Sequence, residues 1–183
     1  MDRPVASVGR RMGAFLLDYL LISVYLALLV AMGIGLGQGP LQGLFHTLFA
    51  DPNRSELSAF LMLVLPVILY FAILESSPWQ ATVGKRVLGL RVTGAQRDRL
   101  NFPRSLARSV LAFVPWELTH ACLWRIPGWP LAPALPAPII VAGLVLVWVM
   151  LAVYLASMLL SKKHQALYDT LTGAYVIQEP GTP

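Results

Sequence analysis

Three ionisable residues in apolar surroundings are the first candidates for chemistry in this chain. Asp18 interrupts the first long apolar stretch, and Glu117 and His120 lie in a later, more polar one. Ionisable groups inside membrane spans are rare, usually face the protein interior, and either pair with another charge or carry a function. Asp18 therefore has two interpretations. It is a structural carboxylate paired with an arginine such as Arg11 or Arg108, or it is a proton or cation site.

Two further ionisable residues, Arg11 and Asp169, lie towards the two ends of the chain. Arg11 is seven residues before Asp18, so on a helix the two share a face and lie about 10 Å apart. Ala14 lies between them, and a small residue there allows close approach of a neighbouring helix. Asp169 either caps a short helical turn or closes an ionic lock with Arg11 or with the Lys85–Arg86 pair. We favour the lock because arginine binds carboxylates in bidentate geometry.

Glu117 and His120 are three residues apart and share one helix face. Together they are either a proton relay or a pair that is solvated at the headgroups, which we favour. With Arg108 they form a secondary set of intramembrane polar residues. Cys122 is the only cysteine, and no ligand cluster with metal spacing accompanies it. We therefore expect no metal site and no cofactor.

Composition narrows the class of protein. The 183 residues are 57% hydrophobic and 13% charged, whereas soluble proteins average about 25% charged residues. This argues against a water-soluble enzyme, and no catalytic set of nucleophile, base and orienting group indicates a membrane enzyme. The basic residues flank apolar runs and do not form one solvated stripe, so we do not expect nucleic acid as a partner.

Four stretches are candidates for membrane spans within a single domain, 1–183. They are residues 13–36, 57–74, 105–124 and 137–160. Each is near the length of about 20 helical residues that a bilayer requires. The stretch 105–124 is interrupted by charged residues, so its periodicity leaves open whether it spans the membrane or lies at the interface.

Charge decides between these two interpretations. In a four-span topology, twelve of the 14 Lys and Arg residues fall on one side, and only Arg54 and Arg125 on the other. The positive-inside rule makes the richer side cytoplasmic. The loop after the second span and the C-terminal tail both lie there, so 105–124 must cross. We predict an all-α membrane protein, a four-helix transmembrane bundle with both termini cytoplasmic. The length of the first stretch and Asp18 argue against a cleaved secretory signal.

The cytoplasmic loop carries a β-prone run. Residues 87–92 are rich in β-branched and apolar side chains and precede a turn signal at 93–95, and residues 174–177 near the C terminus have similar composition. We predict that these two runs pair as short strands, because both lie on the cytoplasmic side.

Three separated motifs resemble those of the RDD family of bacterial membrane proteins, which is named for one arginine and two aspartates. They are RMGAFLLD at 11–18, WQATVGKR at 79–86 followed by GLRV at 89–92, and QALYD at 165–169 followed by Gly173. By this resemblance Arg11, Asp18 and Asp169 are the name-giving residues. The loop motif contributes Thr82, Gly84 and Lys85.

The resemblance implies a multi-pass protein of the bacterial cytoplasmic membrane. Transport is the usual suggestion for the family, and a few relatives are linked to cation/proton exchange. We predict a small transporter or cation/proton exchanger subunit that acts as a homo-oligomer, because four helices hardly enclose a path alone. The alternative is a structural or accessory scaffold for a membrane-protein partner, without transport activity. Anionic lipid headgroups are the expected partners of the cytoplasmic side, which carries twelve of the Lys and Arg residues.

Overall fold

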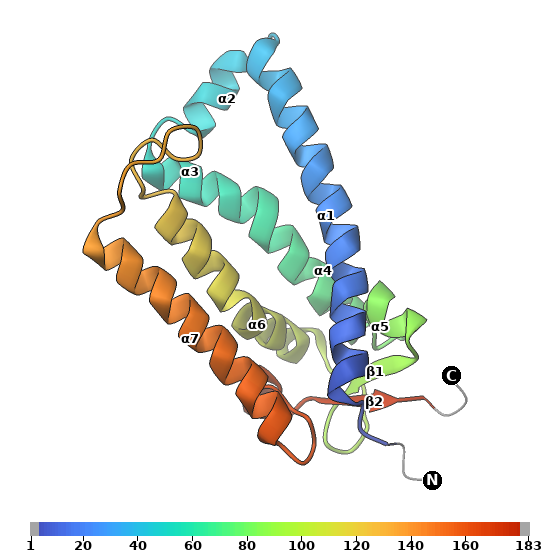
Figure 1. Ribbon diagram of the computed structural model, residues 1–183. Helices are drawn as coiled ribbons and strands as arrows, with labels where there is room; N and C mark the ends of the chain where they lie inside the picture. Colours follow the sequence, from blue (N-terminus) through green and yellow to red (C-terminus); the bar gives the residue numbers. More distant parts are fainter. Residues whose placement is uncertain (1–3, 180–183) are drawn as a thin grey trace. The chain divides into compact units, whose positions relative to one another are not determined.

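The computed structural model describes residues 4–179, which are mostly helical (Figure 1). The longest helices are α1 (Val8–Gln38), α6 (Phe102–Leu123) and α7 (Pro138–Leu160). A further helical stretch runs without a break through α3 (Pro52–Ala59), the π-helical turn η1 (Phe60–Val64) and α4 (Leu65–Ser76). The short helices are α2 (Gln42–Leu48), α5 (Val83–Val87) and α8 (Leu167–Thr172).

Three helical stretches within residues 4–179 are long and apolar enough to cross a membrane. They are Val8–Leu36, Pro52–Ser76 and Pro138–Leu160. These correspond to the predicted spans 13–36, 57–74 and 137–160. The fourth, 105–124, is a helix as expected, but α6 is not among the three because charged and polar side chains interrupt it. The predicted mostly helical fold with apolar spans is therefore confirmed for three candidate spans, whereas a transmembrane bundle of four helices is not confirmed.

The chain divides into two compact units, and α1, α4, α6 and α7 contribute to both. The first unit comprises the described parts of Met1–Leu21, Val67–Phe113 and Leu151–Pro183. The second comprises Ile22–Pro66 and Val114–Met150. The second unit has a small core of Cys122, Ile126 and Ile140, with leucines from α6 and α7 packed against it.

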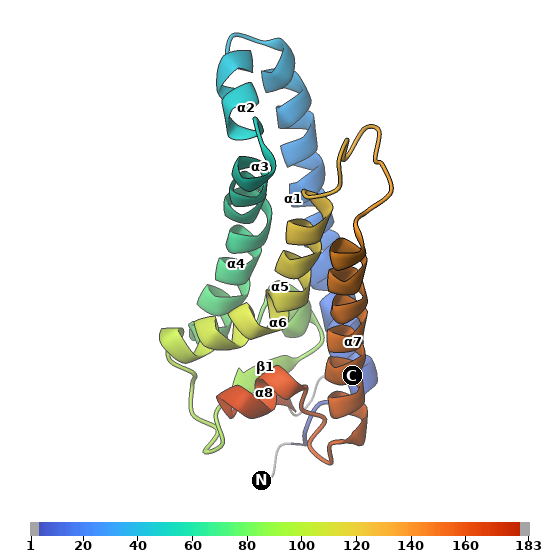
Figure 2. The ribbon, with the colours of Figure 1, turned by 90° about the vertical axis from the view of Figure 1, so that its left-hand side faces the viewer.

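The first unit contains the sheet. Strands β1 (Leu90–Thr93) and β2 (Tyr175–Gln178) pair antiparallel, with Leu90 opposite Gln178 and Thr93 opposite Tyr175. The predicted pairing of the two β-prone runs is therefore confirmed, although Val87 ends α5 and the first strand begins only at Leu90. Strand β1 and helix α8 of this unit can be followed in Figure 2.

The N-terminal segment joins this sheet. Val5 forms an antiparallel bridge with Ile177, and the Ala6 N–H donates to the carbonyl of Val176 at 2.9 Å. The buried apolar side chains of the sheet form one core with residues of α1 and of the loops, namely Ala6, Ala14, Leu90, Val92, Leu100, Ala174 and Val176. This core fixes the start of α1 beside the loop that follows α4.

Pro115 lies inside α6. A proline has no N–H, so the carbonyl of Leu111, four residues earlier, has no helical donor. The hydroxyl of Tyr154, on α7, donates to this carbonyl at 2.6 Å. A side chain from a second helix thus replaces the missing bond, as apolar surroundings require.

Candidate functional site

Five charged side chains form a buried series of ion pairs in the first unit, which we call the ionic chain. Its members, in order, are Arg11, Asp169, Arg108, Glu75 and Lys85. The distance from Arg108 is 2.7 Å to Asp169 and 2.5 Å to Glu75, and Lys85 lies 2.9 Å from Glu75. Both carboxylates are fully buried, and each contacts two cationic groups.

The ionic chain joins segments that are distant in sequence. Arg11 lies in the first turns of α1, Glu75 at the end of α4, Lys85 in α5, Arg108 in α6 and Asp169 in α8. Breaking a buried ion pair by removing one partner is strongly destabilising, because the other charge is left uncompensated. The arrangement therefore ties these helices together.

Asp169 takes part in the predicted lock with Arg11, but it is not the N-cap of a turn as the other interpretation had it. The N-cap of α8 is Ala166, and Asp169, three residues later, accepts a hydrogen bond from the Ala166 N–H at 3.2 Å through Oδ2. The same oxygen accepts a hydrogen bond from Arg11, which also donates to the carbonyl of His164. The Lys85–Arg86 pair takes no part in this lock, because Lys85 binds Glu75 and Arg86 lies over the ring of Trp79 at 4.0 Å.

The charges around Asp169 determine its ionisation. Burial disfavours the carboxylate, but the guanidinium groups of Arg108 and Arg11 outweigh it and hold the pKa of Asp169 below its usual value. Burial raises the pKa of the neighbouring Tyr168 hydroxyl. The Tyr168 ring lies under the Arg108 guanidinium, 5.2 Å from its centre, which adds a cation–π contact to the ion pairs.

Asp18 stands apart from the ionic chain. It is fully buried and accepts three hydrogen bonds, from the Tyr70 hydroxyl at 2.8 Å, the Thr82 hydroxyl at 2.5 Å and the Gly84 N–H at 2.8 Å. All three donors are uncharged. The predicted pairing of Asp18 with Arg11 or Arg108 is therefore wrong, because those guanidinium groups bind Asp169 and Glu75.

The loop motif supplies most of the contacts to Asp18. Thr82 is the N-cap of α5, and its hydroxyl accepts from the Lys85 N–H at 3.4 Å while donating to Asp18. A Cβ at Gly84 would lie 2.2 Å from the carbonyl oxygen of Ala14 and 2.9 Å from the Asp18 carboxyl carbon. Only glycine allows this approach of α5 to α1, and the small residue Ala14 lies at the contact as anticipated.

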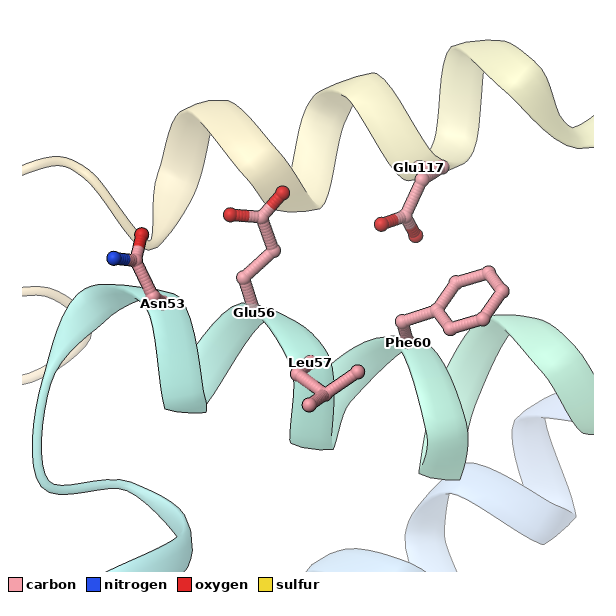
Figure 3. Close-up of a pocket in the computed structure, with 5 residues that line it drawn as sticks. All are labelled: Asn53, Glu56, Leu57, Phe60 and Glu117. Atoms are coloured by element: carbon pink, nitrogen blue, oxygen red, sulfur yellow. The ribbon is translucent and has the colours of Figure 1, made fainter.

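Glu117 and His120 have different surroundings in the second unit. Glu117 faces a groove of about 320 Å³ between α6 and the α3–η1 stretch, as Figure 3 shows. Its Oε2 atom is buried without a hydrogen-bond partner. The Nδ1 atom of His120 lies 2.9 Å from the carbonyl of Trp116. The groove also contains Glu56, which pairs with Arg125 at 2.5 Å.

Sequence reasoning missed two members of this site. Glu75 directly follows the predicted span 57–74, and a carboxylate at a span terminus near a basic loop is a signal for pairing that could have identified it. Tyr70, inside the second span, carried no signal that it donates to Asp18. Among residues 4–179, no group of three His, Cys, Asp or Glu side chains is placed to hold a metal ion.

Long apolar helices with ionised side chains buried among their ends define a helical membrane protein. The RDD family model matches residues 5–173, and the chain belongs to the RDD family. A relative in Bacillus subtilis (strain 168), the uncharacterized protein YxaI, is 25% identical over 114 residues, covering 59% of this chain and 75% of that protein. No solved structure matches this chain.

Proposed function

We propose that this protein is a cation/proton exchanger subunit that acts as a homo-oligomer, with Asp18 as the group that exchanges a proton for a cation. The observation that carries the proposal is the environment of Asp18. It is a fully buried carboxylate within a candidate span, and its three hydrogen-bond donors are uncharged. An ionisable residue inside a span is, by default, a candidate for function.

The donors around Asp18 suit a change of protonation. Tyr70 and Thr82 contribute hydroxyls, which both donate and accept hydrogen bonds. When Asp18 takes up a proton, its O–H can donate to either hydroxyl oxygen. When a cation replaces the proton, the same oxygens can turn towards it, since hard cations prefer oxygen ligands.

The other two buried carboxylates of this region are less suited to exchange. Glu75 and Asp169 each contact two cationic side chains, so an incoming cation would meet like charge. This contrast within one buried region favours Asp18 as the exchanging group.

The proposal places the protein in the bacterial cytoplasmic membrane with both termini in the cytoplasm. Because β1 and β2 pair, they lie on one side, and α6 and α7 together must cross the membrane an even number of times. Since α7 is a candidate span, α6 crosses as well. The concentration of Lys and Arg on the side of the sheet makes that side cytoplasmic, where anionic lipid headgroups are its partners.

A structural or accessory scaffold is the second candidate, and the ionic chain favours it. Five charged side chains from five helices are paired with one another, as expected of a device that holds a fold. In this case Asp18 serves only to anchor α5 to α1, and its substitution changes stability without changing ion flux.

Flux measurements separate the two candidates. Purified protein in proteoliposomes is given a sodium gradient, and proton movement is followed with a pH-sensitive dye. We expect flux with the wild type and its loss with Asp18→Asn. Asp51→Asn is the matched control, because Asp51 is a half-exposed N-cap that asparagine replaces well. Equal flux in wild type and Asp18→Asn, or wild-type flux no greater than in empty liposomes, rejects exchange at Asp18.

A further inference from the structure

The depth of Asp18 in the membrane determines where α5 lies. The candidate span Val8–Leu36 has 29 residues, and the hydrocarbon core requires about 20 of them. The part of this span after Asp18, residues 19–36, is shorter than that. A core of about 20 residues placed within the span therefore includes Asp18, between the middle of the core and the boundary nearer the start of α1.

Helix α5 lies at the same depth, because it touches Asp18 directly. The Thr82 hydroxyl and the Gly84 N–H both donate to the Asp18 carboxylate. Gly84 is so close to α1 that a Cβ there would overlap the Ala14 carbonyl oxygen. Figure 1 shows α5 beside the lower part of α1 and above β1 in this view.

The backbone of α5 is satisfied in the way that a lipid environment demands. The first N–H groups of a helix have no partner within it, and hydrocarbon offers no water to replace one. Here the Val83 N–H donates to the Tyr70 hydroxyl, the Gly84 N–H to Asp18 and the Lys85 N–H to the Thr82 hydroxyl. The Arg86 N–H donates to the Thr82 carbonyl at 2.9 Å. Every donor at this helix start is bound by the protein itself.

The exposed side chains of α5 are two valines and Arg86. Val83 and Val87, four residues apart on one helix face, are 43% and 67% exposed. The nearby exposed side chain of Trp79 lies under the guanidinium of Arg86. Tryptophan with a basic residue is typical of the headgroup level of a membrane. Leu16, Leu17 and Leu20 of α1 are exposed in the same unit, as lipid-facing residues are.

We propose that α5 is a re-entrant element, inserted in the leaflet nearer the start of α1, with Val83 and Val87 in contact with lipid acyl chains. Asp18 anchors this element from within the protein, and the Trp79–Arg86 pair lies at the headgroups. The proposal depends on α1 crossing the membrane and does not depend on ion exchange, so the two can fail separately.

Spin labels measure this placement. Single cysteines are introduced at Val83 and Val87 in a Cys122→Ser background, labelled, and reconstituted in bilayers of anionic and zwitterionic phospholipid. Collisions with oxygen, which concentrates in acyl chains, are compared with collisions with a water-soluble nickel chelate. We expect oxygen to dominate at both positions, as at a Leu20→Cys reference on the exposed face of α1.

A matched control lies in the turn after β1. Ala95 is exposed. A spin label on Ala95→Cys should collide more often with the nickel chelate than with oxygen. If labels at Val83 and Val87 behave like the label at Ala95, α5 lies in water and the proposal is wrong. If both are immobilised and shielded from both colliders, a second copy or another protein covers this face, which also overturns it. Each variant is first required to elute and melt as the cysteine-free protein does.

Discussion

Arg108 binds a single oxygen of Asp169 through two nitrogens, with Nε at 2.8 Å and Nη2 at 2.7 Å from Oδ1. The other oxygen of Asp169 receives Arg11. One carboxylate thereby connects α8 to α6 and to the start of α1. Charge-assisted hydrogen bonds of this kind are about twice as strong as neutral ones. We therefore expect the Asp169 carboxylate to contribute strongly to the stability of the ionic chain.

Neutralising Asp169 should cost more stability than neutralising Arg11. Asp169→Asn leaves two buried guanidinium groups short of a negative charge, whereas Arg11→Gln leaves Asp169 still bound by Arg108. Breaking a buried pair costs about 3–5 kcal/mol. We expect Asp169→Asn to approach that loss and Arg11→Gln to fall below it, as measured by denaturant unfolding in detergent. The double variant should lose less than the sum, and strict additivity would contradict the pairing.

The lowered pKa of Asp169 predicts that the protein loses stability at acidic pH. A carboxyl whose pKa is depressed by folding contributes stability above its unfolded pKa, about 3.9, and loses that contribution as the pH falls through its folded pKa. Between pH 7 and pH 5 this contribution is therefore constant, and it declines at lower pH. Melting temperatures recorded from pH 7 to pH 2 should fall more steeply for the wild type than for Asp169→Asn. Parallel curves would show that Asp169 is not the group responsible.

Gly84→Ala should disrupt the contact between α5 and α1. The added Cβ would lie 2.2 Å from the Ala14 carbonyl oxygen, which is backbone and cannot move aside cheaply. We expect a loss of several kcal/mol, at the upper end of the range of about 0.5–3 kcal/mol for typical single substitutions. Gly9→Ala is the control, since Gly9 is helical and nothing lies within 4 Å of its would-be Cβ. That substitution should be neutral or gain about 0.5–1 kcal/mol.

The sequence was sufficient to predict the long helical stretches and the strand pairing, but not the short helices α2 and α5. Apolar runs over 13–36, 57–74 and 137–160 indicate spans because a bilayer imposes both length and apolar character. The pairing of β1 with β2 followed from two β-prone runs assigned to one side of the membrane. These features depend on the local composition of the chain and on the apolar environment of the bilayer, and local composition can be read directly from the sequence.

The partners within the site were harder to predict. The pairing of Asp169 with Arg11 was among the expected locks, and the structure contains it. Helical spacing placed Arg11 and Asp18 on one face, but it does not reveal that α5 brings Thr82 and Gly84 to Asp18. A buried carboxylate accepts either a cation or several neutral donors, and spacing along one helix does not distinguish them. Only the tertiary arrangement decides which charge meets which.

Tyr154 should matter only while Pro115 is present. The Tyr154 hydroxyl supplies the donor that proline withholds from the Leu111 carbonyl, so Tyr154→Phe leaves that carbonyl unpaired at a cost of about 1–3 kcal/mol. Pro115→Ala restores the helical N–H four residues away. In that background Tyr154→Phe should cost measurably less, as judged by thermal unfolding in detergent. An equal cost in both backgrounds would mean that the hydroxyl does not substitute for the helical bond.

Replacing Glu117 should stabilise the protein. Its Oε2 atom is buried beside the groove with no hydrogen-bond partner, and an unsatisfied buried polar group costs about 1–3 kcal/mol. Glu117→Met removes this group and keeps an unbranched side chain of similar length, so the melting temperature should rise. Glu56→Met serves as the comparison, because Glu56 lines the same groove but is paired with Arg125, and its loss should give no gain. A lower melting temperature for Glu117→Met would mean that a partner satisfies this carboxylate in the bilayer.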